Sequence, residues 1–192
     1  MPKSFTIALN AYSALALLSL LKSFNHEPRP FHVSDIKPTK CWLEYGNPSG
    51  HSLITSSMYL TFWEMLCRSK GWLKGSLAHR LSLALVVALM LIVAFSRIYH
   101  GVHTFNQIIN GWIWGVGLYV LYCDILHFEL CRFVHSLKQK PWNELIWNFG
   151  TKNFFFIYSL AVSMYFIGSY LNPVPQEWLK NIEANCGTID PD

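Results

Sequence analysis

Apolar side chains concentrate in five stretches of the chain, with polar or turn-forming segments between them. The stretches are Ser4–Leu21, Leu53–Cys67, Leu81–Phe95, Ile108–Phe128 and Asn153–Leu171. A helix needs about 20 residues to cross the apolar core of a bilayer, with about 17–25 as the working range. The first, fourth and fifth stretches are long enough alone, whereas the second and third must borrow flanking residues. The pattern therefore predicts about five membrane-spanning helices.

The composition favours the same interpretation. Of the 192 residues, 52% are hydrophobic and only 14% are charged, whereas a soluble domain has about 25% charged residues. These values argue against a disordered chain, a nucleic-acid-binding tail and a typical cytosolic enzyme. The length is that of one domain. We predict an all-α fold, an integral membrane helix bundle.

The placement of positive charge predicts the orientation of this bundle. If the five stretches alternate in direction, one side carries nine of the fifteen Lys and Arg residues: Lys3, Arg68, Lys70, Lys74, Arg80, Arg132, Lys138, Lys140 and Lys152. Cytoplasmic loops carry an excess of such residues. We therefore predict that the opposite side faces the lumen of the endoplasmic reticulum or the cell exterior.

Most of the polar chemistry lies in three blocks at the ends of the predicted helices. Residues Lys22–Pro30 close the first helix, Pro48–His51 open the second, and Ser96–Gln107 connect the third to the fourth. Alternating helices bring all three blocks to one membrane face, the outer one. Three cations and two histidines meeting there predict an anion-binding site.

The residue types at this face favour phosphate as the anion. Arg29 and Arg97 offer planar donor pairs that match phosphate oxygens, and Lys22 adds a compact positive charge. Ser49 and Gly50 lead into a helix N-terminus, where free backbone N–H groups attract anions. The sequence therefore predicts Lys22, Arg29, Ser49, Gly50 and Arg97 as phosphate-binding residues.

Two histidines supply the candidate chemistry at this face. His51 and His103 have side chains that titrate near neutral pH, which suits a nucleophile and a general acid. Carboxylates able to hold a divalent metal are few, and Glu27, Asp35 and Glu44 are the only ones nearby. We therefore predict no metal site and no cofactor.

The three blocks resemble the motifs of the type 2 phosphatidic acid phosphatase family, which shares its site with vanadium haloperoxidases and glucose-6-phosphatase. The family pattern is K-x6-RP, then PSGH, then SR-x5-H-x3-D, and residues 22–30, 48–51 and 96–103 match it. The resemblance covers residues 22–107. It implies that His103 attacks phosphorus to form a phosphohistidine, and that His51 protonates the leaving oxygen and later activates water.

The chain departs from this family pattern in two places. Gln107 stands where the family has Asp, so a catalytic His103 would have an amide partner that accepts its N–H but brings no negative charge. Branches similar to glucose-6-phosphatase and dolichyl diphosphatase also have an amide there. The family usually has two more helices before the first block, so the resemblance implies a piece of a longer protein.

The expected function is metal-independent hydrolysis of a lipid phosphate or lipid diphosphate. The alternatives are a glucose-6-phosphatase-like sugar phosphatase and a non-catalytic phospholipid-binding relative. The expected partners are the phosphorylated substrate and membrane lipids, with no nucleic acid. Residues 1–130 are expected to form the motif-bearing membrane domain. Residues 131–192 would add a cytoplasmic loop, the last spanning helix and an outer-side tail.

Some residues near the blocks have more than one interpretation. Cys41 and Cys186 lie in polar segments and can pair if those segments face an oxidising lumen, but connectivity is not readable from sequence. His26 and His32 are predicted to be solvated loop residues. His100 is predicted to be a loop histidine at the entrance of the site.

Overall fold

The computed structural model describes residues 2–137, 149–171 and 173–187, and the regular elements among them are all helices, with no strand. The predicted all-α fold is therefore confirmed for this part of the chain. The long helices are α1 (Pro2–Asn25), α3 (Gly50–Lys70), α4 (Leu77–Tyr99), α5 (Phe105–Val120) and α8 (Phe149–Leu171). The shorter ones are α2 (Pro30–Val33), the π-helix η1 (Leu121–Ile125), α6 (His127–Leu137) and α9 (Gln176–Cys186).

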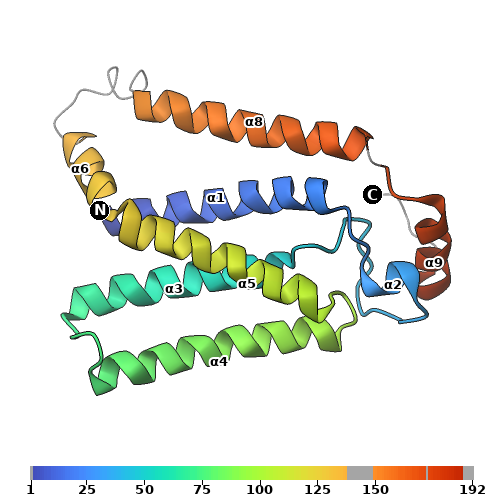
Figure 1. Cartoon of the computed structure of the whole chain (residues 1–192), viewed down its shortest axis with the longest axis horizontal. Helices are drawn as coiled ribbons and strands as arrows, with labels where there is room; N and C mark the ends of the chain where they lie inside the picture. Colours follow the sequence, from blue (N-terminus) through green and yellow to red (C-terminus); the bar gives the residue numbers. More distant parts are fainter. Residues whose placement is uncertain (1, 138–148, 172, 188–192) are drawn as a thin grey trace.

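The long helices lie side by side and alternate in direction (Figure 1). α1 and α4 end where α3 and α5 begin, and α2 and α9 lie at that same end (Figure 1). α8 packs along α1, and α6 lies at the opposite end of the bundle (Figure 1). This alternation brings the three sequence blocks to one end of the molecule.

The helices extend beyond the apolar stretches that predicted them. α3 has 21 residues and α4 has 23, because polar residues continue each helix at both ends. Ser49 and Ser76 cap the N-termini of α3 and α4 through their side chains, and Gly71 ends α3 with a φ of 65°. Both helices are therefore as long as a membrane crossing requires.

Three described segments are both long and apolar enough to cross a membrane: Lys3–Val33, Leu77–Tyr99 and Phe105–Ile125. They mark the protein as a membrane-associated helix bundle. α3 is not among them because much of it is polar. Five of its polar side chains are buried in the bundle: those of Ser52, Ser56, Ser57, Thr61 and Glu64. Asn10 of α1, for example, donates to Thr61 Oγ1 (2.6 Å) and accepts from Ser57 Oγ (2.7 Å).

α3 and α5 share the most extensive helix contact among the described residues, and two glycines make it close. A Cβ atom on Gly115 would lie 1.9 Å from Ser56 Oγ and 2.5 Å from the Leu53 carbonyl oxygen. A Cβ on Gly111 would lie 2.7 Å from the Ser49 carbonyl oxygen. Small residues four apart allow two helix backbones to approach in this way. The first turns of α3 and α5 are consequently held together.

Three local predictions need correction. The fourth apolar stretch is not one α-helix, because α5 ends at Val120 and η1 follows. The connection expected as a loop after residue 130 begins inside α6, whose Phe133 packs against Phe5 of α1. Residues 138–148 of that connection lie outside the described residues. The tail contains α9, although residues 188–192 again lie outside the described part.

The pairing left open for Cys41 and Cys186 is formed, and it joins the loop before α3 to α9. The Cα atoms of the two cysteines are 6.2 Å apart. Ile182 of α9 is fully buried against Phe31 and Val102, and two asparagine side chains of α9 donate to carbonyls of α2. α9 therefore covers α2 and is bonded to the segment between the first two blocks.

The close contact between α3 and α5 predicts different effects for two glycines of the same helix. Gly115→Ala places a methyl group against a backbone carbonyl and should lower stability by about 1–3 kcal/mol, as overpacking does. Nothing lies within 4 Å of a Cβ on Gly117, so Gly117→Ala should be neutral or stabilise by up to about 1 kcal/mol. Thermal unfolding in detergent, followed by tryptophan fluorescence, measures both. Equal effects of the two substitutions would contradict the close packing.

Candidate active site

A cavity of about 250 Å³ lies at the end of the bundle where the three blocks meet. Six of the eight residues predicted for the site line it: Lys22, Arg29, Gly50, His51, Arg97 and His103. α1 and α3 supply apolar walls through Leu18 and Ile54, and Trp42 comes from the loop before α3. Predicted site residues as far apart in sequence as Lys22 and His103, which are 81 positions apart, thus share one cavity.

Arg29 is held in a fixed position at the bottom of this site. Its side chain is only 5% exposed, and its Nε donates to the Glu44 carbonyl oxygen at 2.9 Å. Nη1 donates to the Val102 carbonyl oxygen at 3.2 Å and lies 3.3 Å from His103 Nε2. Pro30 starts α2 immediately afterwards, which suits the first turn of a helix. The guanidinium is therefore directed at the His103 imidazole.

His103 has a partner on each ring nitrogen. Its Nδ1 lies 3.1 Å from Gln107 Oε1, and the Nε2 of that amide donates to the Pro28 carbonyl oxygen at 2.8 Å. The second bond turns the amide oxygen towards the imidazole, so Nδ1–H donates to it. The lone pair of His103 is then on Nε2, facing Arg29 and the cavity. This is the contact that the sequence predicted for Gln107; its catalytic role remains a prediction.

The surroundings of His103 keep its imidazole neutral. Burial, together with the positive charge of Arg29, lowers the pKa of His103 to about 3. The hydrogen bond from Nδ1–H to Gln107 acts in the opposite direction but is too weak to compensate. At physiological pH, Nε2 is therefore unprotonated, and its lone pair, which a nucleophile requires, faces the Arg29 guanidinium.

His51 lies in the first turn of α3, beside the second arginine. Arg97 Nη1 donates to His51 Nε2 at 3.4 Å, and Arg97 Nη2 donates to Ser96 Oγ at 2.9 Å. Burial, and then the positive charges of the neighbouring cations, Arg97 first, hold the pKa of His51 below its ordinary value. The His51 side chain is more exposed than that of His103, so solvent and ligands reach it. Each histidine of the cavity thus has an arginine partner.

Ser49 and Gln107 lie behind the cavity wall. The Ser49 hydroxyl is fully buried, where it accepts from the Ser52 N–H (3.5 Å) and the Ser52 hydroxyl (3.0 Å) and caps α3. The Ser49 N–H donates to the Gln107 carbonyl oxygen at 2.9 Å. The assignment of Ser49 as a phosphate-binding residue stays a prediction, because in this structure its hydroxyl caps α3.

Two residues of the site escaped the sequence analysis. Glu44, considered there only as a metal ligand, forms an ion pair with Lys22 and lies 3.9 Å from Arg29 Nη2. Gly46 lies against Gln107, where a Cβ would be 2.7 Å from the amide nitrogen. Their position in the short loop between the first two blocks was the only available signal.

The prediction that His32 is solvated is wrong. His32 is fully buried, and its Nε2 lies 3.0 Å from the Trp42 carbonyl oxygen. The reason is α9, whose Trp178 stacks near the imidazole with ring centroids 5.7 Å apart. His26 is half-buried against Tyr45, with ring centroids 5.0 Å apart. His100 ends α4 and bonds to the hydroxyl of Thr39 at 3.0 Å.

Comparison with known proteins identifies one family. A family model described as the PAP2 superfamily matches residues 4–129, which is more than half of the chain. The matched range runs from α1 to the start of α6 and includes all eight residues predicted for the site. α8 and α9 lie outside it. No curated protein and no solved structure matches the chain.

The geometry around His103 predicts an unusual titration. Spectra of protein with ¹⁵N-labelled histidine should show His103 neutral and protonated on Nδ1 from about pH 5 to about pH 8. Gln107→Glu should raise the pKa of His103, because an adjacent carboxylate favours the charged imidazole. Gln107→Leu should remove the preference for the Nδ1–H form. A wild-type His103 that titrates near the ordinary histidine value would contradict the described burial and partners.

Proposed function

The chain belongs to the PAP2 superfamily, whose members are phosphoric ester hydrolases, and we propose that it hydrolyses a lipid phosphate or lipid diphosphate through a phosphohistidine. The observation that carries this proposal is the unprotonated Nε2 of His103. This nitrogen faces the cavity beside Arg29, and the hydrogen bond between Nδ1–H of the same ring and Gln107 fixes the tautomer. A neutral, oriented imidazole next to an anion-binding guanidinium suits attack on phosphorus.

In the first step, His103 Nε2 forms a bond to phosphorus while the bond from phosphorus to the leaving oxygen breaks. His51, in its protonated form, gives its proton to that oxygen, and the alcohol departs. In the second step, His51 takes a proton from water as the water oxygen bonds to phosphorus. The phosphorus–nitrogen bond then breaks, which releases phosphate and restores His103.

The cations of the cavity would stabilise the charge that grows on the phosphoryl oxygens. Lys22, Arg29 and Arg97 reach the cavity from the ends of α1 and α4 and from the segment before α2. The N-terminal turn of α3, beginning at Gly50, adds free backbone N–H groups and a favourable helix dipole. Loss of one such donor usually costs an enzyme about 100- to 1,000-fold in rate.

The membrane context favours a lipid substrate at an outer or lumenal face. We infer that the chain crosses the bilayer several times, with about five spans, because its long helices alternate and three are apolar enough to cross. The Cys41–Cys186 disulfide lies at the same end as the cavity, and disulfides persist in oxidising compartments. Arg68, Lys70 and Arg80 lie at the opposite end, which the positive-inside rule assigns to the cytoplasm.

A sugar phosphate is the second candidate substrate. Gln107 permits it, because the glucose-6-phosphatase-like branch resembles this chain in having an amide at that position, as does the dolichyl-diphosphatase-like branch. Leu18 and Ile54 in the cavity wall favour a lipid instead, since they offer apolar surface close to the phosphate-binding residues. A non-catalytic phospholipid-binding relative would keep the cations but release no phosphate.

Phosphate release in the presence of EDTA tests the proposed reaction. The detergent-solubilised protein should release phosphate from phosphatidate, from a polyprenyl diphosphate or from glucose 6-phosphate, and the preferred substrate identifies the branch. His103→Ala should abolish release, because no other group supplies the nucleophile. His135→Ala is the matched control: His135 is an exposed histidine of α6, at the opposite end of the bundle, and its loss should leave the rate unchanged.

Either of two results would refute the phosphohistidine mechanism. One is full activity of the His103→Ala protein, and the other is activity that EDTA removes. A folded wild-type protein that releases no phosphate from any of the three substrates would instead support the non-catalytic relative.

The position of His51 among cations predicts an acidic pH optimum for kcat/KM. The pH dependence of kcat/KM reports the pKa values of groups in the free enzyme. In the free enzyme, the pKa of His51 is below its ordinary value. Because His51 must be protonated to act as the acid, kcat/KM should fall as the pH rises through that lowered pKa. A bound phosphate neutralises the cations and favours the imidazolium, so the corresponding fall in kcat should lie at higher pH.

Arg97 provides the matched test of this pH dependence. Arg97→Gln removes a positive charge beside His51, so the fall in kcat/KM should move to higher pH even though activity drops. Arg97→Lys keeps the charge and should leave the position of the fall nearly unchanged. Identical profiles for Arg97→Gln and the wild-type protein would show that His51 is not the titrating acid.

A further inference from the structure

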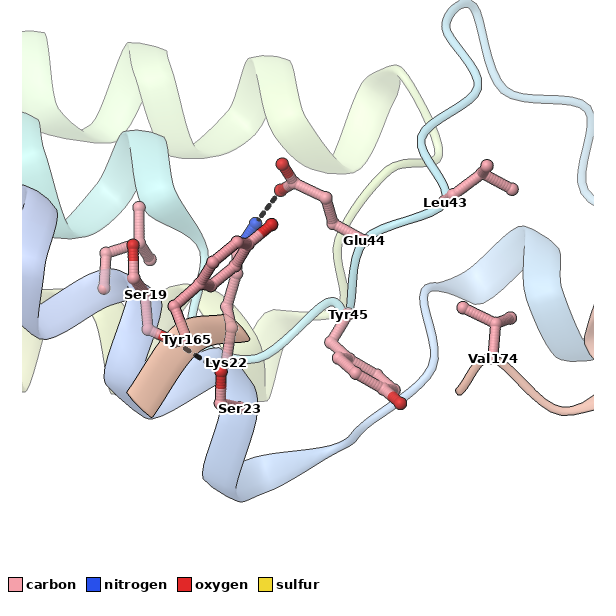
Figure 2. A pocket seen from close by; sticks show the side chains of 9 residues that line it. Ser19, Lys22, Ser23, Leu43, Glu44, Tyr45, Tyr165 and Val174 are labelled. Carbon is pink, nitrogen blue, oxygen red and sulfur yellow. Dashed lines mark hydrogen bonds and ion pairs between the residues drawn. The ribbon is translucent and has the colours of Figure 1, made fainter. Parts of the chain in front are cut away.

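The predicted phosphate-binding cations are already in contact with a carboxylate of the same chain. Lys22 and Glu44 form an ion pair, and the Glu44 carboxylate lies 3.9 Å from Arg29 Nη2. Figure 2 shows the two side chains reaching towards each other from α1 and from the loop before α3. Two of the three cations of the cavity thus face an internal anion where a phosphoryl group would bind.

The Glu44 carboxylate is charged in this position. Burial alone would raise the pKa of Glu44, but the bond from Lys22 and the charges of Lys22 and Arg29 outweigh it and lower the pKa below its ordinary value. An ionised carboxylate resembles part of a phosphate, because it offers oxygen acceptors to the same ammonium and guanidinium donors. It therefore competes with a ligand anion for those donors.

The side chain of Glu44 is half exposed, whereas its backbone is held in place. The carboxylate-bearing side chain is 51% exposed, whereas those of Lys22 and Arg29 are 12% and 5% exposed. The Glu44 carbonyl oxygen accepts from Arg29 Nε, and the Cys41–Cys186 bond anchors the same loop to α9. The loop thus remains in place when the carboxylate rotates away.

Space for the displaced carboxylate is present on the other side of the ion pair. A second cavity of about 320 Å³ shares Leu18, Lys22 and Glu44 with the first. Tyr45 and Tyr165 lie around it (Figure 2). The Lys22–Glu44 pair therefore separates two open spaces, and the Glu44 side chain can turn from the first towards the second without a change in the fold.

We propose that Glu44 is an internal competitor that an incoming phosphoryl group must displace from Lys22. A phosphodiester has one negative charge, as the carboxylate does, so exchanging one for the other gains little. A phosphate monoester at neutral pH carries up to two charges and three free oxygens, so it gains more from the same cations. The cost of displacing Glu44 is the same for both and lowers the affinity for every anion, which leaves the diesters that make up most membrane phospholipids with little net gain.

This inference rests on the proposed function for its substrate, but anion binding tests it without turnover. The ligands are inorganic phosphate, which stands for the monoester, and dimethyl phosphate, which stands for the diester. Calorimetry in detergent gives the Kd of each ligand for the wild-type chain and for Glu44→Gln. The glutamine variant should bind both ligands more tightly, by about tenfold or more, because the cost of displacing the carboxylate is lost for each of them. The ratio of the two Kd values should change much less than either Kd.

Two further variants serve as controls. Glu27→Gln removes the same charge from an exposed position of the neighbouring segment and should leave both Kd values unchanged. In a Lys22→Gln background, Glu44→Gln should have little effect, because the ammonium over which the two anions compete is gone. Thermal unfolding of each variant verifies that the fold is intact.

Several outcomes would overturn the inference. Weaker binding by Glu44→Gln would show that the carboxylate positions Lys22 for the ligand. Unchanged Kd values would show that Glu44 does not compete for Lys22, even if the protein hydrolyses phosphate esters. Tighter binding by a protein that hydrolyses none of them would leave the competitor role standing and refute only the proposed reaction.

Discussion

The close approach of α3 and α5 is the contact on which the site depends. Gly111 and Gly115 leave no room for a side chain between the two backbones, so the first turns of both helices lie together. The Ser49 N–H then reaches the Gln107 carbonyl oxygen, and His51 and His103 face the same cavity. A wider spacing would separate His51 from His103, whatever the quality of the individual motifs.

The second constraint is electrostatic. Three cations around two histidines attract an anion, while burial first and these cations second disfavour the charged imidazole and lower the pKa values of His103 and His51. An amide partner at Gln107 fixes the tautomer of His103 without adding a buried charge. Glu44 offsets part of the positive charge in the empty cavity. The same balance therefore governs the nucleophile, the acid and the affinity for the ligand.

The sequence predicted the parts of this protein that local pattern determines. Apolar stretches located the long helices, and the internal spacing of the three blocks located six residues that line the cavity. Features that depend on tertiary contact were missed. His32 is buried only because α9 folds back over α2, and Gly46 matters only because Gln107 packs on it. The pairing of Glu44 with Lys22 needs a loop whose course no periodicity determines.

The Cys41–Cys186 bond gives this site an order of assembly. A chain grows from its N-terminus, so all three motif blocks are made before Cys186, which follows Cys41 by 145 residues. Until then, the segment that carries Glu44 has no covalent tether to α9. The finished cavity therefore depends on the synthesis of nearly the whole described chain and on an oxidising environment in which this bond can form.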